Sequence, residues 1–182
     1  MYFYFLSHMM CAPPDGRSSS HLSGRVATMC AFTDGSYDSK TKTYSHGAVV
    51  FYNSQIIQLK GHASNKFSIY GNVAGEIAGV IHVLSLAKKK GIKTLTLYHD
   101  YIGISKWASG EWKAGNDLTQ LYVNYVKKSG LKIDFIHVKA HTGKKDPVFL
   151  LNDVCDSLAK KELKATKREL TIYDSHLSQG FM

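Results

Sequence analysis

The sequence predicts an α/β domain built on a mixed five-stranded β-sheet with helices packed on its faces. Two observations support this fold class. Three strand-like segments come first, the second and third joined by a two-residue turn, and strand-like and helix-like segments then alternate. With 182 residues, 44% of them hydrophobic and 20% charged, the chain has the composition of one soluble globular domain with a buried core.

The individual elements follow from periodicity and from turn and cap residues. Apolar runs predict the strands, and Asn53-Ser54 joins the second and third in a tight hairpin. Asn72 stands where an N-cap is expected, and the helix after it ends in lysines and at Gly91. Asn152 is expected to open the last helix. The predicted elements are strands 29–34, 46–52, 55–64, 94–100 and 132–140, and helices 73–89, 101–109, 117–130 and 153–165.

Local composition also divides the chain. Residues 1–28 join an aromatic start without a basic region to a segment rich in Pro, Gly and Ser. This pattern predicts a disordered extension or a start site downstream of residue 1, and not a signal peptide. The folded domain is expected over 29–165, and 166–182 form a C-terminal tail without a recognisable pattern. No run of about 18 apolar residues predicts a membrane span.

Charge and cysteine content limit the partners and the compartment. The net charge of +9 is spread over both halves of the chain and favours a polyanionic partner, nucleic acid above all, although solubility alone also explains such a charge. The cysteines, Cys11, Cys30 and Cys155, are odd in number and form no CxxC pair, which argues against a disulfide framework and a zinc site. We expect a reducing, cytoplasmic setting and a monomer.

Acidic residues stand at places where sites of α/β sheets gather. Asp34 follows the apolar run of the first strand in AFTDGSY, and Asp100 ends the fourth strand in TLTLYHD. Taken alone, either is most simply a turn residue. Glu76 lies on the helix 73–89, roughly 80° from the centre of its apolar stripe at about 100° per residue, so its side chain can reach the sheet.

The last predicted helix offers two more acids. Asp156 lies roughly 120° and Asp153 roughly 180° from the centre of the apolar stripe, so Asp156 is the better inward candidate. Asp153, in the first turn, is explained as a partner of the helix dipole. Four carboxylates in contact repel one another and take up protons unless cations join them. Mg²⁺ prefers oxygen ligands, and two such ions about 3.5–4 Å apart can clamp the attacking and leaving oxygens of a phosphodiester.

Five motifs together resemble type 1 ribonuclease H. FTDGSY, NVAGEIAGVIHVL, LYHDYIGISKW, VKAHTG and NDVCDSLAKK occur in this order over residues 29–165. The stretch DYIGISKWASGEWKA is especially similar to the bacterial branch, whose members often carry an N-terminal hybrid-binding module; residues 1–28 are too short for that module, which we expect to be absent. The resemblance implies the RNase H-like fold and an endonuclease that hydrolyses the RNA strand of RNA–DNA hybrids with two Mg²⁺ ions, or Mn²⁺.

The resemblance also implies the roles of individual residues. Carried over onto this sequence, the catalytic and metal-binding carboxylates are Asp34, Glu76, Asp100 and Asp156. His141 of KAHTG matches a mobile histidine that transfers protons or assists release of product and metal, and a histidine titrates near neutrality. Without its flanking residues, His141 is most simply a solvated loop histidine.

Several residues suit contact with a hybrid substrate. Gly35 and Ser36 follow the first acid, where the backbone can approach a ribose closely. Asn72 resembles the asparagine with which the family contacts the minor groove, a role compatible with capping. For the DNA strand the candidates mix aromatic rings with cations, although either tryptophan could instead anchor the core. They are Lys106, Trp107, Trp112 and Lys113.

The chain departs from the family pattern in places. The stretch between Asp100 and His141 is too short for the long basic protrusion of some members, Ile102 stands where some carry a polar side chain, and the loop 143–151 looks expanded. Two alternatives stay open. One is a hybrid- or RNA-binding domain that kept the fold but is catalytically weak or inactive; the other is an integrase- or resolvase-like transferase. The presence of all four acids and of the full motif set favours the nuclease.

Overall fold

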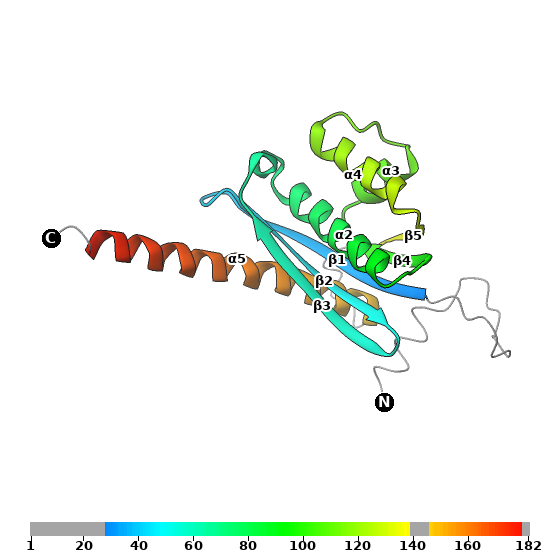
Figure 1. The fold of residues 1–182 in the computed structure, drawn as a ribbon, viewed down its shortest axis with the longest axis horizontal. Helices are drawn as coiled ribbons and strands as arrows, with labels where there is room; N and C mark the ends of the chain where they lie inside the picture. The colour runs from blue at the N-terminus through cyan, green and yellow to red at the C-terminus, as the bar shows by residue number, and fades with distance from the viewer. Residues whose placement is uncertain (1–27, 139–145, 180–182) are drawn as a thin grey trace.

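A mixed five-stranded sheet with strand order β3-β2-β1-β4-β5 forms the centre of the fold (Figure 1), which confirms the predicted fold class. The computed structural model describes residues 28–138 and 146–179, with side chains in the last segment up to Thr166. The strands are β1 (Thr28–Asp38), β2 (Thr43–Tyr52), β3 (Gln55–Ala63), β4 (Thr94–His99) and β5 (Lys132–His137). The helices are η1 (Lys66–Tyr70), α2 (Asn72–Lys89), α3 (Gly103–Ser109), α4 (Asp117–Ser129) and α5 (Pro147–Gln179).

The central strand β1 sets the register of the sheet. It pairs antiparallel with β2 and parallel with β4, and β5 continues the parallel half. Because β1 is covered on both faces, its first residues form an unbroken apolar run. In the β1–β4 pairing, Thr33 lies opposite His99. The next residue on each chain is an aspartate, so Asp34 and Asp100 emerge side by side.

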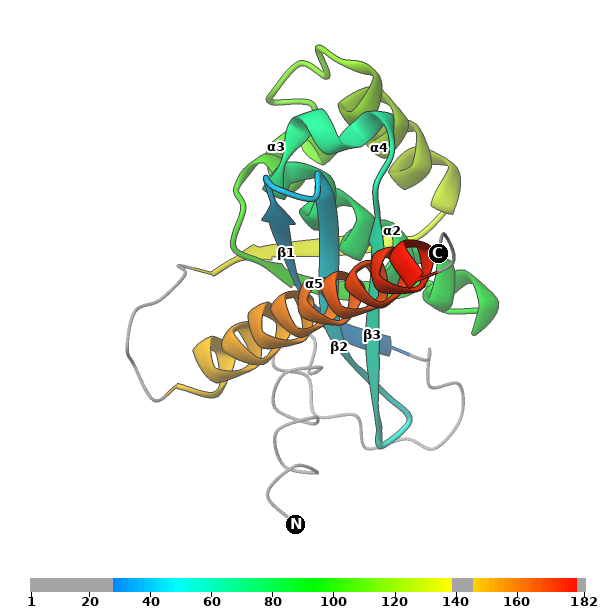
Figure 2. The same ribbon diagram turned by 90° about the vertical axis from the view of Figure 1, so that its left-hand side faces the viewer.

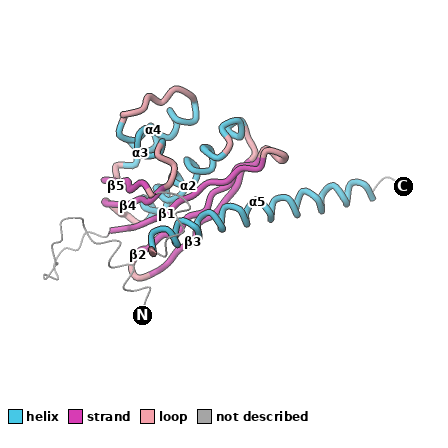
Figure 3. Tube along the Cα trace, turned by 180° about the vertical axis from the view of Figure 1, so that it is seen from behind, coloured by secondary structure: helices cyan, strands magenta, loops and turns pink. Residues whose placement is uncertain are grey.

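Helices cover both faces of the sheet, as Figures 2 and 3 show: α2, with α3 and α4 beside it, lies on one face, and α5 crosses the other. Alternate residues of β1 supply the two cores. Met29 and Ala31 pack with Ile77 in the core under α2. Phe32 packs with Cys155 in the core under α5 and stacks on Tyr98 with ring centroids 4.3 Å apart.

Glycines allow two helices to approach the sheet closely. A Cβ on Gly35 of β1 would overlap the backbone nitrogen of Glu76, and one on Gly75 of α2 would overlap the carbonyl oxygen of Ser45. On the other face, a Cβ on Gly47 of β2 would overlap the carbonyl oxygen of Cys155 in α5. Both helices therefore lie nearer to β1 and β2 than any side chain at these positions would permit.

The predicted turn at Asn53-Ser54 and the predicted stop at Gly91 are confirmed, whereas the predicted helix starts at Asn72 and Asn152 are wrong, since Asn152 lies inside α5. Asn53 and Ser54 both have positive φ, at 47° and 62°, as a tight hairpin turn requires. Gly91, where α2 was expected to end, has a φ of 68°, and Gly130 has the same φ at the end of α4. Asn72 does not cap α2: Gly71 occupies the N-cap position and Asn72 is the first helical residue.

Helix α5 is longer at both ends than the predicted helix 153–165. It begins earlier in the chain than predicted, at Pro147, because Asp146 Oδ1 accepts the Val148 backbone N–H at 2.9 Å and proline suits the first turn. No glycine or proline follows until Gly180, so nothing in the sequence stops the helix earlier. The C-terminal turns extend beyond the sheet (Figures 1 and 3). Within the described ranges no helix, α5 included, is long and apolar enough to cross a membrane.

The close contact between β2 and α5 makes Gly47 a sensitive position. We expect Gly47→Ala to lower the stability by about 1–3 kcal/mol, because a methyl group there must displace the α5 backbone. Thermal unfolding followed by circular dichroism measures this as a lower Tm. Gly115→Ala is the matched control, since nothing lies within 4 Å of its added Cβ. Equal Tm values for the two variants would contradict the packing described here.

Candidate functional site

Three of the four predicted carboxylates converge at the end of the central strands. One carboxylate oxygen each from Asp34, Glu76 and Asp100 lies within 4.8 Å of the others. Asp34 and Glu76 are each only 6% exposed, and Asp100 is half-buried. Together they form a buried acidic cluster that opens to solvent on the side of Asp100.

Three features of the fold bring these side chains together. The β1–β4 register places Asp34 beside Asp100. The contact of α2 with Gly35 places the first turns of that helix directly over β1, and Glu76 with them. Asp100 follows immediately after β4, so its side chain lies at the C-terminal end of that inner strand. Sheet pairing and helix packing, and not sequence proximity, therefore build the cluster.

The pKa values of two carboxylates in the cluster are raised, which shows that their ionisation is unfavourable. Burial, together with the charges of Asp100 and Asp156, raises the pKa of Asp34 to about 7. Burial and the charge of Asp34 raise the pKa of Glu76 well above its ordinary value. Asp34 and Glu76 therefore both resist ionisation, because each is buried and lies close to other carboxylates.

Asn152 supports the cluster and was not identified as a site residue from the sequence, where it was expected only to open the last helix. It lies inside α5, is 2% exposed, and its Nδ2 donates to Asp100 Oδ2 at 3.3 Å. Its Oδ1 is buried and has no hydrogen-bond partner among the described residues. The sequence did offer a signal in NDVCD: Asn152 stands three residues before Cys155 and four before Asp156, a spacing that puts all three on one side of a helix.

The fourth predicted carboxylate lies next to the cluster and has a different partner. Asp156 is close enough for its charge to raise the pKa of Asp34, yet it is not among the three carboxylates that lie within 4.8 Å of one another. Its Oδ2 accepts a hydrogen bond from Lys160 Nζ at 2.8 Å, one helical turn further along α5. The ion pair holds Asp156 beside the cluster from the α5 face of the sheet.

The remaining predicted residues lie at varying distances from the cluster. Gly35 and Ser36 continue β1 directly beyond Asp34, and Asn72 is exposed at the start of α2. Its carbonyl oxygen lies 2.9 Å from the Cβ position of Gly35, so this end of α2 borders the same backbone. His141 lies outside the described residues.

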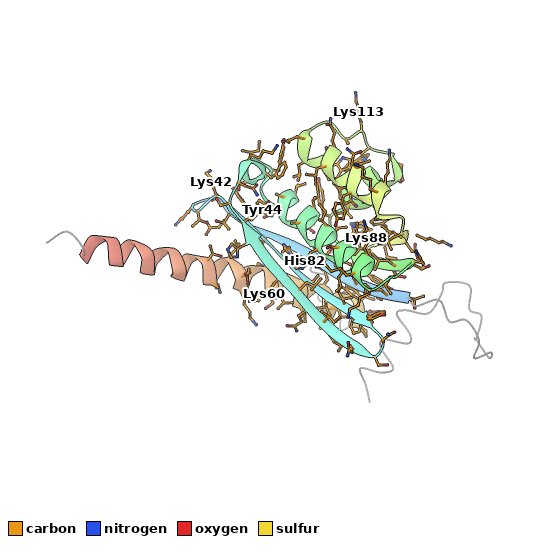
Figure 4. The ribbon with its side chains drawn as sticks, viewed as in Figure 1. Lys42, Tyr44, Lys60, His82, Lys88 and Lys113 are labelled. Carbon is orange, nitrogen blue, oxygen red and sulfur yellow. The ribbon has the colours of Figure 1, made fainter. Side chains whose placement is uncertain are left out.

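The aromatic and cationic residues that were predicted to contact a DNA strand lie on the α3 side. Trp107 packs against the core and lies 5.7 Å from Tyr101 and 5.9 Å from Trp112 between ring centroids. Trp112 is 42% exposed. Lys106 pairs with Glu111, whereas Lys113 points away from the body of the protein (Figure 4). The structure thus makes Trp107 partly a core residue and leaves Trp112 and Lys113 at the surface.

The donor set fits a hard divalent cation. All three clustered groups are carboxylates, and oxygen ligands are what Mg²⁺ and Mn²⁺ prefer. Glu76 Oε2 is buried and accepts no hydrogen bond from the described residues. A buried acceptor of this kind is costly unless a ligand satisfies it.

Comparison with known protein families identifies the chain. A sequence model of the RNase H family matches residues 27–164. The chain belongs to the RNase H family. This match includes the strands, α2 and the part of α5 that carries Asn152 and Asp156, and the motifs of the type 1 branch are consistent with it. A comparison with curated protein sequences gave no match.

Solved structures share the RNase H fold with this chain. The N-terminal RNase H domain of a Mycobacterium tuberculosis protein, solved as a fusion with maltose-binding protein, is 19% identical, with a TM-score of 0.64 over 79% of this chain and 99% of the other. RNase H1 from the archaeon Halobacterium salinarum is 18% identical, with a TM-score of 0.61 over 76% and 98%. LC11-RNase H1, solved with an RNA/DNA hybrid, is 13% identical, with a TM-score of 0.60 over 76% and 98%.

The raised pKa of Asp34 predicts how stability depends on pH in metal-free RNase H protein. Between about pH 4 and pH 7 the folded state keeps protons that the unfolded state has lost, so stability falls as the pH rises. We expect Asp34→Asn, which removes the charge, to be more stable than the wild type at pH 8 in EDTA by on the order of 2 kcal/mol, or about 4–8 °C in Tm.

The same comparison at pH 3 is the control, because Asp34 is then protonated in the folded protein and in most unfolded chains. The difference in Tm between variant and wild type should shrink there. A variant that is less stable than the wild type at every pH would mean that the Asp34 carboxylate makes a favourable interaction in the metal-free fold.

Proposed function

We propose that this RNase H family protein cleaves the RNA strand of RNA–DNA hybrids, with divalent cations held by Asp34, Glu76, Asp100 and Asp156. The observation that carries the proposal is the convergence of three carboxylates, two of them buried and with pKa values raised by burial and by neighbouring charges. The likeness to LC11-RNase H1, whose structure contains an RNA/DNA hybrid, supports the choice of substrate. Mg²⁺, with Mn²⁺ as the alternative, is the cation that these ligands suit best.

The chain's own residues each have a part in this chemistry. Two bound divalent cations supply the Lewis acidity that activates a water and stabilises the departing oxygen of a phosphodiester. Asp34, Glu76 and Asp100 hold the charge at the edge of the sheet, where a nucleic-acid backbone can reach it. Asn152 fixes the orientation of Asp100 by donating to its Oδ2. His141 is proposed to move protons or to assist product release.

Selectivity for a hybrid requires different contacts with the two strands. A protein distinguishes RNA from DNA at a given position by the ribose 2′-OH. The backbone at Gly35 and Ser36, next to Asp34, is accessible enough for such a contact because neither residue is fully buried. The surface near Trp112 and Lys113 offers a ring and a cation to the DNA strand, which suits sugar stacking and phosphate contact.

One observation favours a second candidate, a hybrid-binding domain that cleaves weakly or not at all. Asp156 is engaged by Lys160, so a second cation gains this ligand only if the ion pair opens. The ion pair lies at the surface, with Lys160 57% exposed, and exposed pairs of this type contribute at most about 1 kcal/mol. Cation binding can therefore displace it, and we rank the nuclease first. A cytoplasmic location, a monomeric state and the extents of the terminal segments stay predictions.

A cleavage assay tests the proposed function. We expect the wild type to cut only the RNA strand of a labelled RNA–DNA hybrid, in Mg²⁺ or Mn²⁺ and not in EDTA. Asp34→Asn should reduce the rate by at least about 10³-fold, because it removes a central ligand, while binding of the hybrid in EDTA stays within about twofold.

Single-stranded RNA and duplex RNA are the substrate controls, and neither should be cut. Retained cleavage by Asp34→Asn would remove Asp34 from the metal site. Binding of the hybrid by the wild type without cleavage in either metal would favour the inactive binding domain.

His141 is expected to matter for turnover and not for the metal site. His141→Ala should slow steady-state cleavage by about 10–100-fold without abolishing it, because proton transfer by one side chain typically contributes about 10²–10⁴-fold and water can partly replace it. The measurement is the pH dependence of the steady-state rate, in which the variant should lose an inflection near neutrality. A complete loss of cleavage would mean that His141 has a more central role than proton transfer or release.

A further inference from the structure

A pocket of about 370 Å³ lies beside the acidic cluster, on the α5 face of the sheet. Residues 37–40, at the end of β1 and in the turn to β2, form one wall. Lys160, Leu163 and Lys164 of α5 form the other. The pocket is therefore bounded by the two elements that carry Asp34 and Asp156, and apart from Lys160, the ion-pair partner of Asp156, neither wall contains a residue that the proposed function uses.

The pocket carries an excess of positive charge. Three lysines, Lys40, Lys160 and Lys164, line it against one acid, Asp38. Asp38 Oδ1 accepts the Lys40 backbone N–H at 2.9 Å, so this carboxylate helps to shape the turn. Of the three lysines, only Lys160 forms an ion pair with a described residue, and that residue is Asp156. Lys40 and Lys164 are both exposed.

The lysines continue outward from the acidic cluster in regular steps. Asp156, Lys160 and Lys164 follow one another at intervals of four residues on α5, so they share a face and rise by about 6 Å per step. On β1, Asp38 lies four residues beyond Asp34, or about 13 Å of strand. The pocket thus begins next to the carboxylates and extends about two helical turns away from them.

We propose that this pocket binds backbone phosphates of the RNA strand next to the position where that strand is cut. The inference rests on the proposed function, because the acidic cluster then holds the scissile phosphate. Lysines contact phosphates as point charges and add affinity without reading sequence. Tyr37 and Leu163 supply apolar surface between the charges, which suits the sugar of the same strand.

The side of the sheet decides which strand the pocket takes. The pocket lies between β1 and α5, whereas Trp112 and Lys113 follow α3, beside the helices on the opposite face. Figure 4 shows Lys113 and Lys42 far apart, Lys42 being in the same turn as the pocket residue Lys40. Gly35 and Ser36, proposed to contact ribose, lead along β1 directly into the pocket wall. A duplex over the cluster therefore presents its RNA strand to α5 and its DNA strand to the α3 side.

Binding measured in EDTA tests the pocket separately from cleavage. The variants are Lys40→Ala, Lys164→Ala and the double variant, none of which touches a cluster carboxylate. We expect the double variant to bind an RNA–DNA hybrid about tenfold more weakly and to lower the slope of log affinity against log salt by about two, one for each lost phosphate contact. Lys132→Ala, at an exposed lysine where β5 starts, is the matched control and should bind like the wild type.

Neutral phosphates identify the strand. Hybrids with methylphosphonate linkages beside the cut position, in either the RNA or the DNA strand, are bound to the wild type and to the double variant. We expect RNA-strand neutralisation to weaken wild-type binding and to add nothing in the double variant, whereas DNA-strand neutralisation should weaken both proteins equally. The reverse pattern, or a double variant with wild-type affinity and salt slope, would overturn the proposal. Cleavage by the wild type in Mg²⁺ is scored independently, so failure of the proposed function is a separate outcome.

Discussion

The close contact between the backbones of β1 and α2 determines how the groups of α2 lie relative to Asp34, and the candidate site depends on it. Gly35 and Gly75 face each other without side chains, and a methyl group on either would push the helix away from the sheet. The contact puts Glu76 within reach of Asp34. It also fixes the start of α2, and with it Asn72, beside the strand that follows Asp34. A site made of carboxylates therefore depends on residues that have no functional group.

The cluster that this contact creates is electrostatically unfavourable by itself. Burial and the charges of neighbouring carboxylates raise the pKa values of Asp34 and Glu76, so both groups resist ionisation in the metal-free protein. Glu76 Oε2, which is buried and has no hydrogen-bond partner among the described residues, is placed to act as a ligand in the proposed metal site. In that proposal the cation offsets the repulsion that disfavours the metal-free cluster, and such a conflict between stability and function is common at functional sites.

The sheet separates two kinds of surface around the cluster. On one side, α3 and the segment after it present rings and a cation, with Trp107 tied to the core and Trp112 exposed. On the other, α5 and the β1–β2 turn border an open pocket lined by lysines. An RNA–DNA hybrid also has two chemically different strands. The asymmetry of the fold therefore matches the asymmetry of the proposed substrate, with the carboxylates at the boundary between the two surfaces.

The sequence alone determined the fold class, the order of the elements and three converging acids, because periodicity, turn residues and the family motifs are all local signals. Asp100 was recognised at a strand end for that reason, and the hairpin at Asn53 was as well, whereas the prediction that Asp34 ends its strand was wrong, because pairing with β2 continues β1 to Asp38. Local signals failed where neighbours compete: Gly71 took the cap position expected for Asn72, and α5 ran past residue 165 because no residue stops it.

Only the tertiary structure revealed the contacts between residues far apart in the chain. The bond from Asn152 to Asp100 spans 52 positions, and the lysine pocket joins a β-turn to a helix more than 100 residues later. No periodicity encodes such contacts, because they arise from the packing of α5 over Gly47 and from the register of β1 against β4. The sequence supplied the groups, and the packing of two helices against one strand decided which of them meet.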